Sequence, residues 1–175
     1  SYRVDDCLEL VTSAGAAFQG WFFNAPYHAH ETSAMGGGFQ AALNALPTAT
    51  QWSVMERLNA DNACHFFMAC HPQRAQSLSV TDFSSAGWLD TIPCLRMRCG
   101  LDEDSIFRPN WRMPLNPTQR VFAGLVDGQR SIREIIAQAA HPDRIQLDRR
   151  EDMEIYARKL FQSLWRLDFI AMTRR

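Results

Sequence analysis

Two short aromatic runs, each closed by a proline, constrain this chain more than any other feature. FQGWFFNAP spans residues 18–26 and HFFMACHP spans residues 65–72. Short apolar runs bounded by turn-forming residues are typical of buried β-strands. More than thirty residues of largely helical pattern separate the two runs, and this stretch offers no other strand to pair with. The two runs therefore predict an antiparallel hairpin that closes a larger sheet, most of which lies outside these 175 residues.

The sequence around the hairpin predicts a first domain over residues 1–72. Apolar residues at the i, i+3, i+4, i+7 spacing predict a helix over 3–14, and these are Val4, Cys7, Leu8 and Val11. Gly15 is expected to end this helix. Between the strands we expect a flexible glycine-rich loop over 30–38, a short helix over 39–47, and a second helix capped by Thr48 or Thr50.

Residues 73–105 are expected to form a linker. QRAQSLSVTDFSSAG, residues 73–87, is polar and small and is typical of a surface loop. The next stretch, WLDTIPCLRMRCG, predicts one or two irregular strands broken by Pro93. LDEDS, residues 101–105, predicts an acidic turn.

Residues 106–175 carry clear helix signals and predict a second domain. Asn116 followed by Pro117 is a helix start, and Ser131 with Glu134 is a capping box. A longer amphipathic helix is expected over 151–169, and FIAM is expected to close the domain as a strand. Three helices with flanking strands predict a winged-helix-like domain. The fold class predicted for the whole chain is α+β: a small antiparallel hairpin with a helical insert, followed by this winged-helix-like three-helix domain.

Composition narrows the cellular setting. The net charge is −1, which gives no bulk attraction to nucleic acid or to an acidic membrane. The five cysteines are odd in number and form no CxxC pair, which favours a reducing compartment. No apolar run is long enough to span a bilayer, and the start lacks a signal-peptide pattern. A cytoplasmic location is expected, and the preference for arginine over lysine points to a GC-rich bacterial genome.

Motifs that would reveal catalysis are missing from the sequence. There is no GxSxG, no Walker lysine and no HExxH. Several histidines and cysteines lie beside the two strands, but their spacing matches no zinc pattern, so no metal site is predicted. These residues are His28, His30, Cys64, His65, Cys70 and His71. In the last helix Arg158, Lys159 and Arg166 alternate with acidic side chains, so DNA binding is not expected to be tight.

The stretch YRVDDCLELVTSAGAAFQGWFFNAPY, residues 2–27, resembles part of the bacterial class I SAM-dependent methyltransferases. In that family a helix precedes the sixth strand, and the sixth and seventh strands form an antiparallel hairpin at the sheet edge. FQGW resembles the sixth strand, HFFMACHP resembles the seventh, and the tail PLNPTQRVFAGLVDGQRSIREIIAQA is similar to a winged-helix-like region found in some members.

The resemblance implies that this chain is a non-catalytic C-terminal accessory region that shapes a substrate pocket or docks a partner. The family's SAM-binding glycine loop and acidic residue precede the part matched here, so no SAM-binding residue is assigned and no cofactor is expected in this chain. Trp21, Tyr27 and His28, near the end of the first strand, are the expected substrate or partner contacts. The expected partners are a methyltransferase core, a protein or peptide, or a second copy that pairs with the open edge as a homodimer.

A second resemblance competes for the tail. LNPTQRVFAGLVDGQRSIREI followed by EDMEIYARKLFQSLWRLDFI is also similar to PqqD-like peptide-recognition domains. These domains hold a leader peptide by strand addition. SIFRPNWRMP, residues 105–114, would then supply strands. This makes a peptide-binding module the alternative function, and a winged-helix DNA-binding regulator comes third.

Overall fold

The computed structural model describes residues 2–29, 36–59, 62, 64–74, 81–141 and 150–174. Within these ranges the protein is α+β, with six α-helices and small antiparallel sheets of two or three strands. Contacts divide the chain into one unit of Ser1–Val80 and another of Thr81–Arg175. The division falls inside the linker expected over 73–105. None of the helices in the described ranges combines the length and the apolar character needed to cross a bilayer.

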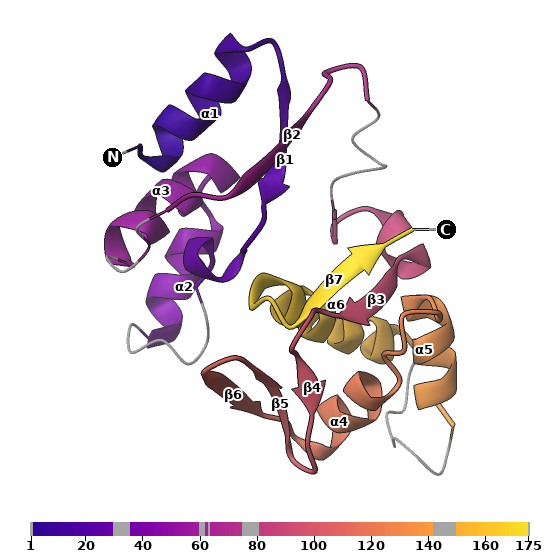
Figure 1. Ribbon diagram of the computed structural model, residues 1–175. Coiled ribbons are helices and arrows are strands. Elements are labelled where there is room, and N and C mark those ends of the chain that lie inside the picture. The colour runs from indigo at the N-terminus through magenta and orange to yellow at the C-terminus, as the bar shows by residue number, and fades with distance from the viewer. Residues whose placement is uncertain are drawn as a thin grey trace. The chain divides into compact units, whose positions relative to one another are not determined.

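The first unit contains the predicted hairpin (Figure 1). Its elements in order are α1 (Val4–Ser13), β1 (Ala17–Trp21), η1 (Ala25–Tyr27), α2 (Gly36–Asn44), α3 (Thr48–Leu58) and β2 (Phe67–Cys70). Strands β1 and β2 pair antiparallel, with Trp21 opposite Phe67. The pairing of two aromatic runs far apart in sequence is therefore confirmed, as is the helical insert between them.

Helix α1 ends where the sequence predicts. Gly15 follows the helix with φ +69°, a left-handed conformation that glycine adopts without a steric penalty. The Gly15 N–H bonds the Thr12 carbonyl at 2.9 Å, and the Ala16 N–H bonds the Val11 carbonyl at 3.0 Å. These two bonds form a Schellman motif, which satisfies the last carbonyls of the helix and turns the chain into β1.

Two expectations about the insert are wrong. Residues 30–35 of the expected loop lie outside the described residues, but Gly36–Gly38 belong to α2, which begins at Gly36. The first turn of a helix has no intrahelical N–H bonds to lose, so glycine is tolerated there better than in the middle. Neither Thr48 nor Thr50 caps α3: its N-cap is Pro47, which makes no side-chain cap bond.

The second unit begins with residues that the sequence assigned to the linker. Its elements are η3 (Ala86–Asp90), β3 (Ile92–Leu95), β4 (Gly100–Leu101), β5 (Ser105–Arg108), β6 (Trp111–Pro114), α4 (Pro117–Gly124), α5 (Ile132–Ala139), α6 (Arg150–Arg166) and β7 (Ile170–Thr173). Strand β3 pairs antiparallel with β7, while β4, β5 and β6 form a three-stranded meander. Pro93 lies within β3, opposite Met172, and does not break it. Phe83, expected in a surface loop, is 5% exposed and lies in the core.

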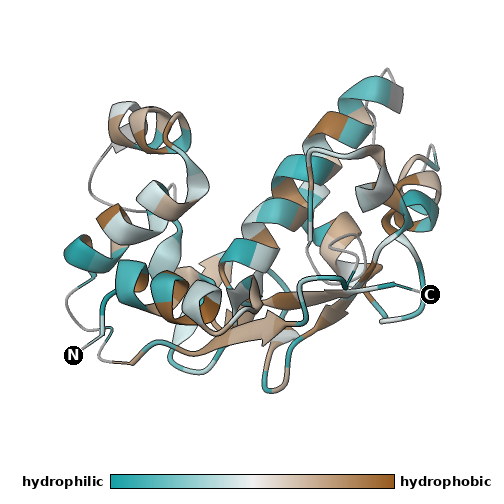
Figure 2. Cartoon of the chain, turned by 90° about the horizontal axis from the view of Figure 1, so that it is seen from above, coloured by the Kyte–Doolittle hydropathy of each residue, from teal (hydrophilic) through white to brown (hydrophobic). Residues whose placement is uncertain are grey.

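The helix signals of the second unit are confirmed. The Asn116 side chain accepts from the Gln119 N–H at 2.9 Å, and the Ser131 hydroxyl accepts from the Glu134 N–H at 3.3 Å. Polar and apolar residues alternate along α6, the longest helix, so that one side faces the core (Figure 2). The apolar residues spaced along one side of α4, α5 and α6 are buried in this core, and they include Phe122, Leu125, Ile132, Ile135, Ile136, Met153, Leu160, Leu164 and Leu167.

Truncation of Phe122 tests this core. The side chain is fully buried and contacts Phe161 edge-on at 6.3 Å between ring centroids. We expect Phe122→Ala to lower the free energy of unfolding of the second unit by about 3–5 kcal/mol, because it removes buried area and leaves a cavity. The control is Ile155→Ala on α6, where the side chain is 51% exposed, and it should change stability little. Equal effects in urea unfolding would contradict this core assignment.

Candidate functional site

The three residues predicted as substrate or partner contacts are all buried in the first unit. Trp21 ends β1, Tyr27 ends η1, and His28 follows it; they are 3%, 2% and 7% exposed. Trp21 and Tyr27 stack, with ring centroids 4.0 Å apart and 17° between the ring planes. The structure therefore brings Trp21 and Tyr27 together, and their role as substrate or partner contacts stays a prediction.

Tyr27 belongs to a buried hydrogen-bond network that the sequence did not predict. Its hydroxyl lies 2.7 Å from His65 Nδ1, and His65 Nε2 lies 3.1 Å from Glu56 Oε1. The Asn62 amide donates to the same Tyr27 hydroxyl oxygen at 3.2 Å. A phenol, an imidazole and a carboxylate are thus joined in series, which we call the Tyr27–His65–Glu56 network.

The partners of His65 assign its tautomer. A carboxylate only accepts hydrogen bonds, so Nε2 carries the proton that is donated to Glu56. In the neutral imidazole the other ring nitrogen, Nδ1, has a lone pair and accepts from the Tyr27 hydroxyl. His65 therefore faces the phenol as a base whose far side is oriented by Glu56, the relation that a general base has to its orienting group in hydrolytic triads.

Local structure explains how the network is assembled. Glu56 projects from α3, and its second oxygen accepts the Val4 N–H at 3.1 Å at the start of α1. On the same helix the Ser53 hydroxyl donates to Asp5 at 2.7 Å. Just beyond it, the Asn59 amide donates to the Pro26 carbonyl at 2.6 Å. These bonds hold α3 against α1 and against the turn that carries Tyr27.

Burial shifts the pKa of two groups at this site upward. The pKa of Tyr27 is raised mainly by burial, with smaller contributions from Cys7 and Glu56, while the Asn62 hydrogen bond acts in the opposite direction. Burial likewise raises the pKa of the Cys7 thiol, and the negative charges of Asp6 and Glu56 add to the effect. Both groups are therefore held in their neutral forms at neutral pH.

Exposed apolar side chains gather at the end of the β1–β2 ribbon where Trp21 pairs with Phe67. Phe22, Phe23, Phe66 and Met68 are 51%, 44%, 56% and 45% exposed. Phe22 contacts Phe23 edge-on at 5.0 Å, and Phe23 contacts Phe66 in the same way at 6.1 Å. We call these four residues the aromatic face.

The histidines and cysteines weighed as metal ligands are not brought together. Among the described residues, no three histidine, cysteine or acidic side chains cluster closely enough to hold a metal ion. His65 binds Tyr27 and Glu56 instead. His30 lies outside the described residues.

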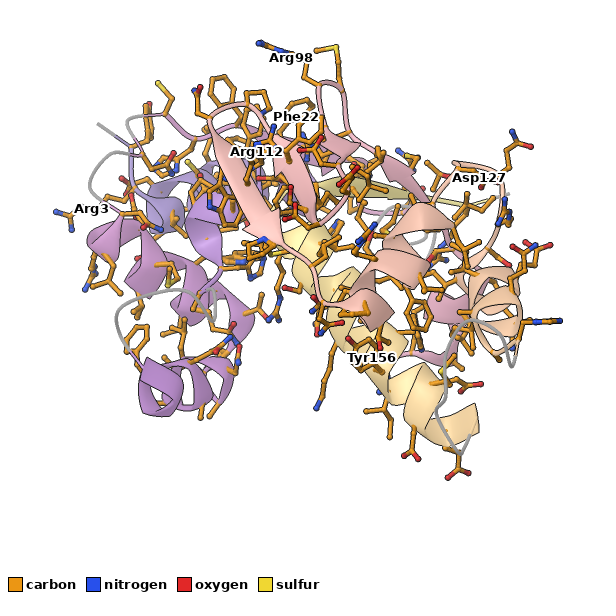
Figure 3. The ribbon with its side chains drawn as sticks, turned by 90° about the horizontal axis from the view of Figure 1, so that it is seen from below. Arg3, Phe22, Arg98, Arg112, Asp127 and Tyr156 are labelled. Carbon is orange, nitrogen blue, oxygen red and sulfur yellow. The ribbon has the colours of Figure 1, made fainter. Side chains whose placement is uncertain are left out.

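In the second unit, Arg133 of α5 and Arg130 of the loop before it are paired with carboxylates. Arg133 lies 2.9 Å from Asp90, and Arg130 lies 3.0 Å from Asp127. Figure 3 shows Asp127 at the turn between α4 and α5. On α6, Arg158 lies over the Trp88 ring at 5.6 Å, and burial lowers the pKa of Arg166. Three of these cations are engaged within the unit and Arg166 is partly buried, which reduces the charge available for phosphates.

Sequence reasoning missed Glu56, Asn62 and the role of His65. Glu56 stands in an ordinary amphipathic helix, and no motif marks it. The one available signal was that Glu56 and His65 are polar residues between the last turn of a helix and the start of an aromatic strand. No protein-family model matches the chain.

Alkaline pH is expected to destabilise the first unit. The pKa values of Cys7 and Tyr27 are raised in the fold above 9.0 and 10.0. A raised pKa means that the folded state holds the proton more tightly. The stabilisation is therefore complete below the unfolded pKa and is lost as the pH rises through the folded value.

We expect the free energy of unfolding of the first unit, measured with urea, to fall as the pH is raised from about 8 to about 11. Tyr27→Phe should flatten the upper part of this fall, and Tyr2→Phe, at a residue 68% exposed, should not. An identical pH dependence in wild type and Tyr27→Phe would contradict the assignment.

Proposed function

We propose that this chain is a non-catalytic accessory region of a class I SAM-dependent methyltransferase-like protein, and that its first unit completes the edge of that protein's sheet. The observation that carries the proposal is the end of the β1–β2 ribbon where Trp21 pairs with Phe67, which has apolar side chains on both sides. A methyltransferase core is the partner that fits such a ribbon.

The inner face of the ribbon is already covered. Phe18, Trp21 and Phe67 pack together there, with Trp52 of α3 5.6 Å from Trp21. The aromatic face on the other side is exposed. Strands that are apolar on both faces are typical of α/β sheets, which have helices on both sides. Within the described part of the chain, the β1–β2 ribbon has helices on one side only, so the other side is open to the cover that an α/β sheet would have.

The edge of β2 supports the same proposal. The Phe22 N–H bonds the Phe66 carbonyl at 2.7 Å, so Phe22 and Phe66 are a hydrogen-bonded pair and the next pair, Trp21 and Phe67, is not. The backbone N–H and C=O of Phe67 therefore point away from β1. A two-stranded ribbon is marginally stable by itself, and a further strand alongside β2 would pair these groups. The order helix, strand, helical insert, strand is the order expected of the sixth and seventh strands of the methyltransferase sheet.

The proposal also gives a role to the predicted contact residues. Trp21 and Tyr27 are buried, so they would support the residues that line a neighbouring substrate pocket without touching the substrate themselves. His28, at the end of η1, would do the same. Such a role depends on the Tyr27–His65–Glu56 network, which holds η1 in place.

Binding of SAM tests this proposal. We expect calorimetric titration of the 175-residue chain with SAM to give no heat, because none of the described strands is followed by the glycine-rich turn and acidic residue of a donor site. The chain extended by the polypeptide encoded directly upstream of Ser1 should bind SAM. Micromolar binding by the 175 residues alone, or an upstream region without a glycine-rich loop, would overturn the proposal.

A second candidate function is peptide binding by the second unit, and the edge strand β6 favours it. The Leu115 N–H bonds the Asp104 carbonyl at 2.8 Å, so Arg112 and Pro114 turn their backbone groups away from β5. An extended peptide would add to this edge, as in PqqD-like domains. We propose that the unit is winged-helix-like, with α4, α5 and α6 beside the meander. Figure 3 shows Arg112 on β6.

A matched pair of variants tests peptide addition at β6. Arg112→Ala keeps the backbone N–H, whereas Arg112→Pro removes it. We expect peptides selected from a random displayed library on the wild-type chain to bind Arg112→Ala unchanged. They should bind Arg112→Pro about fivefold more weakly or worse, the cost of one hydrogen bond. Equal loss in both variants would place the binding on the side chain and contradict strand addition.

A further inference from the structure

A row of aromatic rings leads from the surface of the first unit to the Tyr27–His65–Glu56 network. Trp52 is half-buried, and its ring centroid is 5.6 Å from that of Trp21. Trp21 is 3% exposed and stacks on Tyr27 at 4.0 Å. Each ring in this row is in contact with the next.

Burial decides which chemistry is open to Tyr27. Its phenol is joined to a base as a catalytic nucleophile would be, but at 2% exposure no substrate can touch it. Electron transfer needs no such contact, because an electron passes between rings in van der Waals contact. The neutral phenol, held so by burial that raises its pKa, then has to release its proton when it loses an electron.

His65 is placed to take that proton. An oxidised phenol is a strong acid, and His65 Nδ1 lies 2.7 Å from the oxygen with its lone pair toward the hydroxyl. The imidazolium that forms would keep its other N–H on the Glu56 carboxylate at 3.1 Å, which stabilises the new positive charge. The Asn62 amide continues to donate to the phenol oxygen.

We propose that Tyr27 is a one-electron redox centre, reached through Trp52 and Trp21. A one-electron oxidant takes an electron from Trp52 and is itself reduced. The oxidised Trp52 then receives an electron from Tyr27 through Trp21. In the same event the Tyr27 O–H bond breaks and its proton moves to His65 Nδ1. The products are the reduced oxidant, a neutral tyrosyl radical and an imidazolium paired with Glu56. This inference is independent of the proposed methyltransferase role.

The other two tyrosines supply the comparison within the same chain. The Tyr156 hydroxyl donates to the Asn116 side-chain oxygen at 3.2 Å, and its ring stacks on Phe122 at 5.9 Å (Figure 3). An amide oxygen accepts a hydrogen bond but is too weak a base to take the proton. Tyr2 is 68% exposed. Tyr156 therefore resembles Tyr27 in being stacked and hydrogen-bonded, but it is less buried, its ring stacks on a phenylalanine, and its hydroxyl donates to an amide and not to a base.

The test is oxidation of the whole chain by photogenerated ruthenium(III) tris-bipyridine, with the radical identified by electron paramagnetic resonance on protein carrying ring-deuterated tyrosine. We expect a tyrosyl signal in wild type, in Tyr2→Phe and in Tyr156→Phe. In Tyr27→Phe it should be replaced by a tryptophanyl signal. His65→Gln keeps an acceptor and removes the base, so the tyrosyl signal should be lost there too. Trp52→Phe should slow its appearance.

Three results would overturn the proposal: a full tyrosyl yield in Tyr27→Phe, a full yield in His65→Gln, or a yield that follows Tyr2 or Tyr156. Circular dichroism and urea unfolding establish that each variant is folded. If Tyr27→Phe does not fold, the double variant Tyr2→Phe/Tyr156→Phe leaves Tyr27 as the only tyrosine. The proposal then requires that double variant to give the wild-type yield.

Discussion

The carboxylate of Glu56 is the group on which the arrangement of the first unit most depends. One oxygen accepts the Val4 N–H at the start of α1, and the other accepts from His65 just before β2. Because Glu56 stands on α3, these two bonds join the first helix, the insert and the second strand. Glu56 is partly buried, and a carboxylate that has lost part of its water is costly unless it is hydrogen-bonded, so the segments around it are held to the positions that satisfy it.

The two units differ in how they obtain a core. The second unit buries a contiguous set of aliphatic and aromatic side chains from all three of its α-helices, and capping boxes begin two of them. The first unit has a smaller core of Val4, Cys7, Trp21 and Tyr27 and adds polar bonds around it. It also exposes the aromatic face, whereas the comparable residues of the second unit are mostly inside. This asymmetry is why the partner that we propose is placed at the first unit.

The same burial that closes the Tyr27 site to substrates gives the site its chemical character. Within the described residues, Tyr27 is held neutral, next to a base, and in contact with one indole ring that contacts another. A structural role for the network and a redox role do not exclude each other. The hydrogen bond from Tyr27 to His65 that helps to position η1 is also the path by which His65 would receive the proton.

Local pattern alone determined much of the fold. The helix over 4–13 with its glycine stop, the two capping boxes, the inward stripes of α4 to α6 and the closing strand β7 were all predictable, because caps and periodicity act within a few residues. The pairing of β1 with β2 was predictable because the intervening stretch offered no other strand. Only the tertiary structure decided that Phe83 enters the core, that Pro93 lies in a paired strand, and that Glu56, Asn62 and His65 meet Tyr27. Those contacts join residues far apart in the chain, and a single sequence carries no periodicity or spacing that reports them.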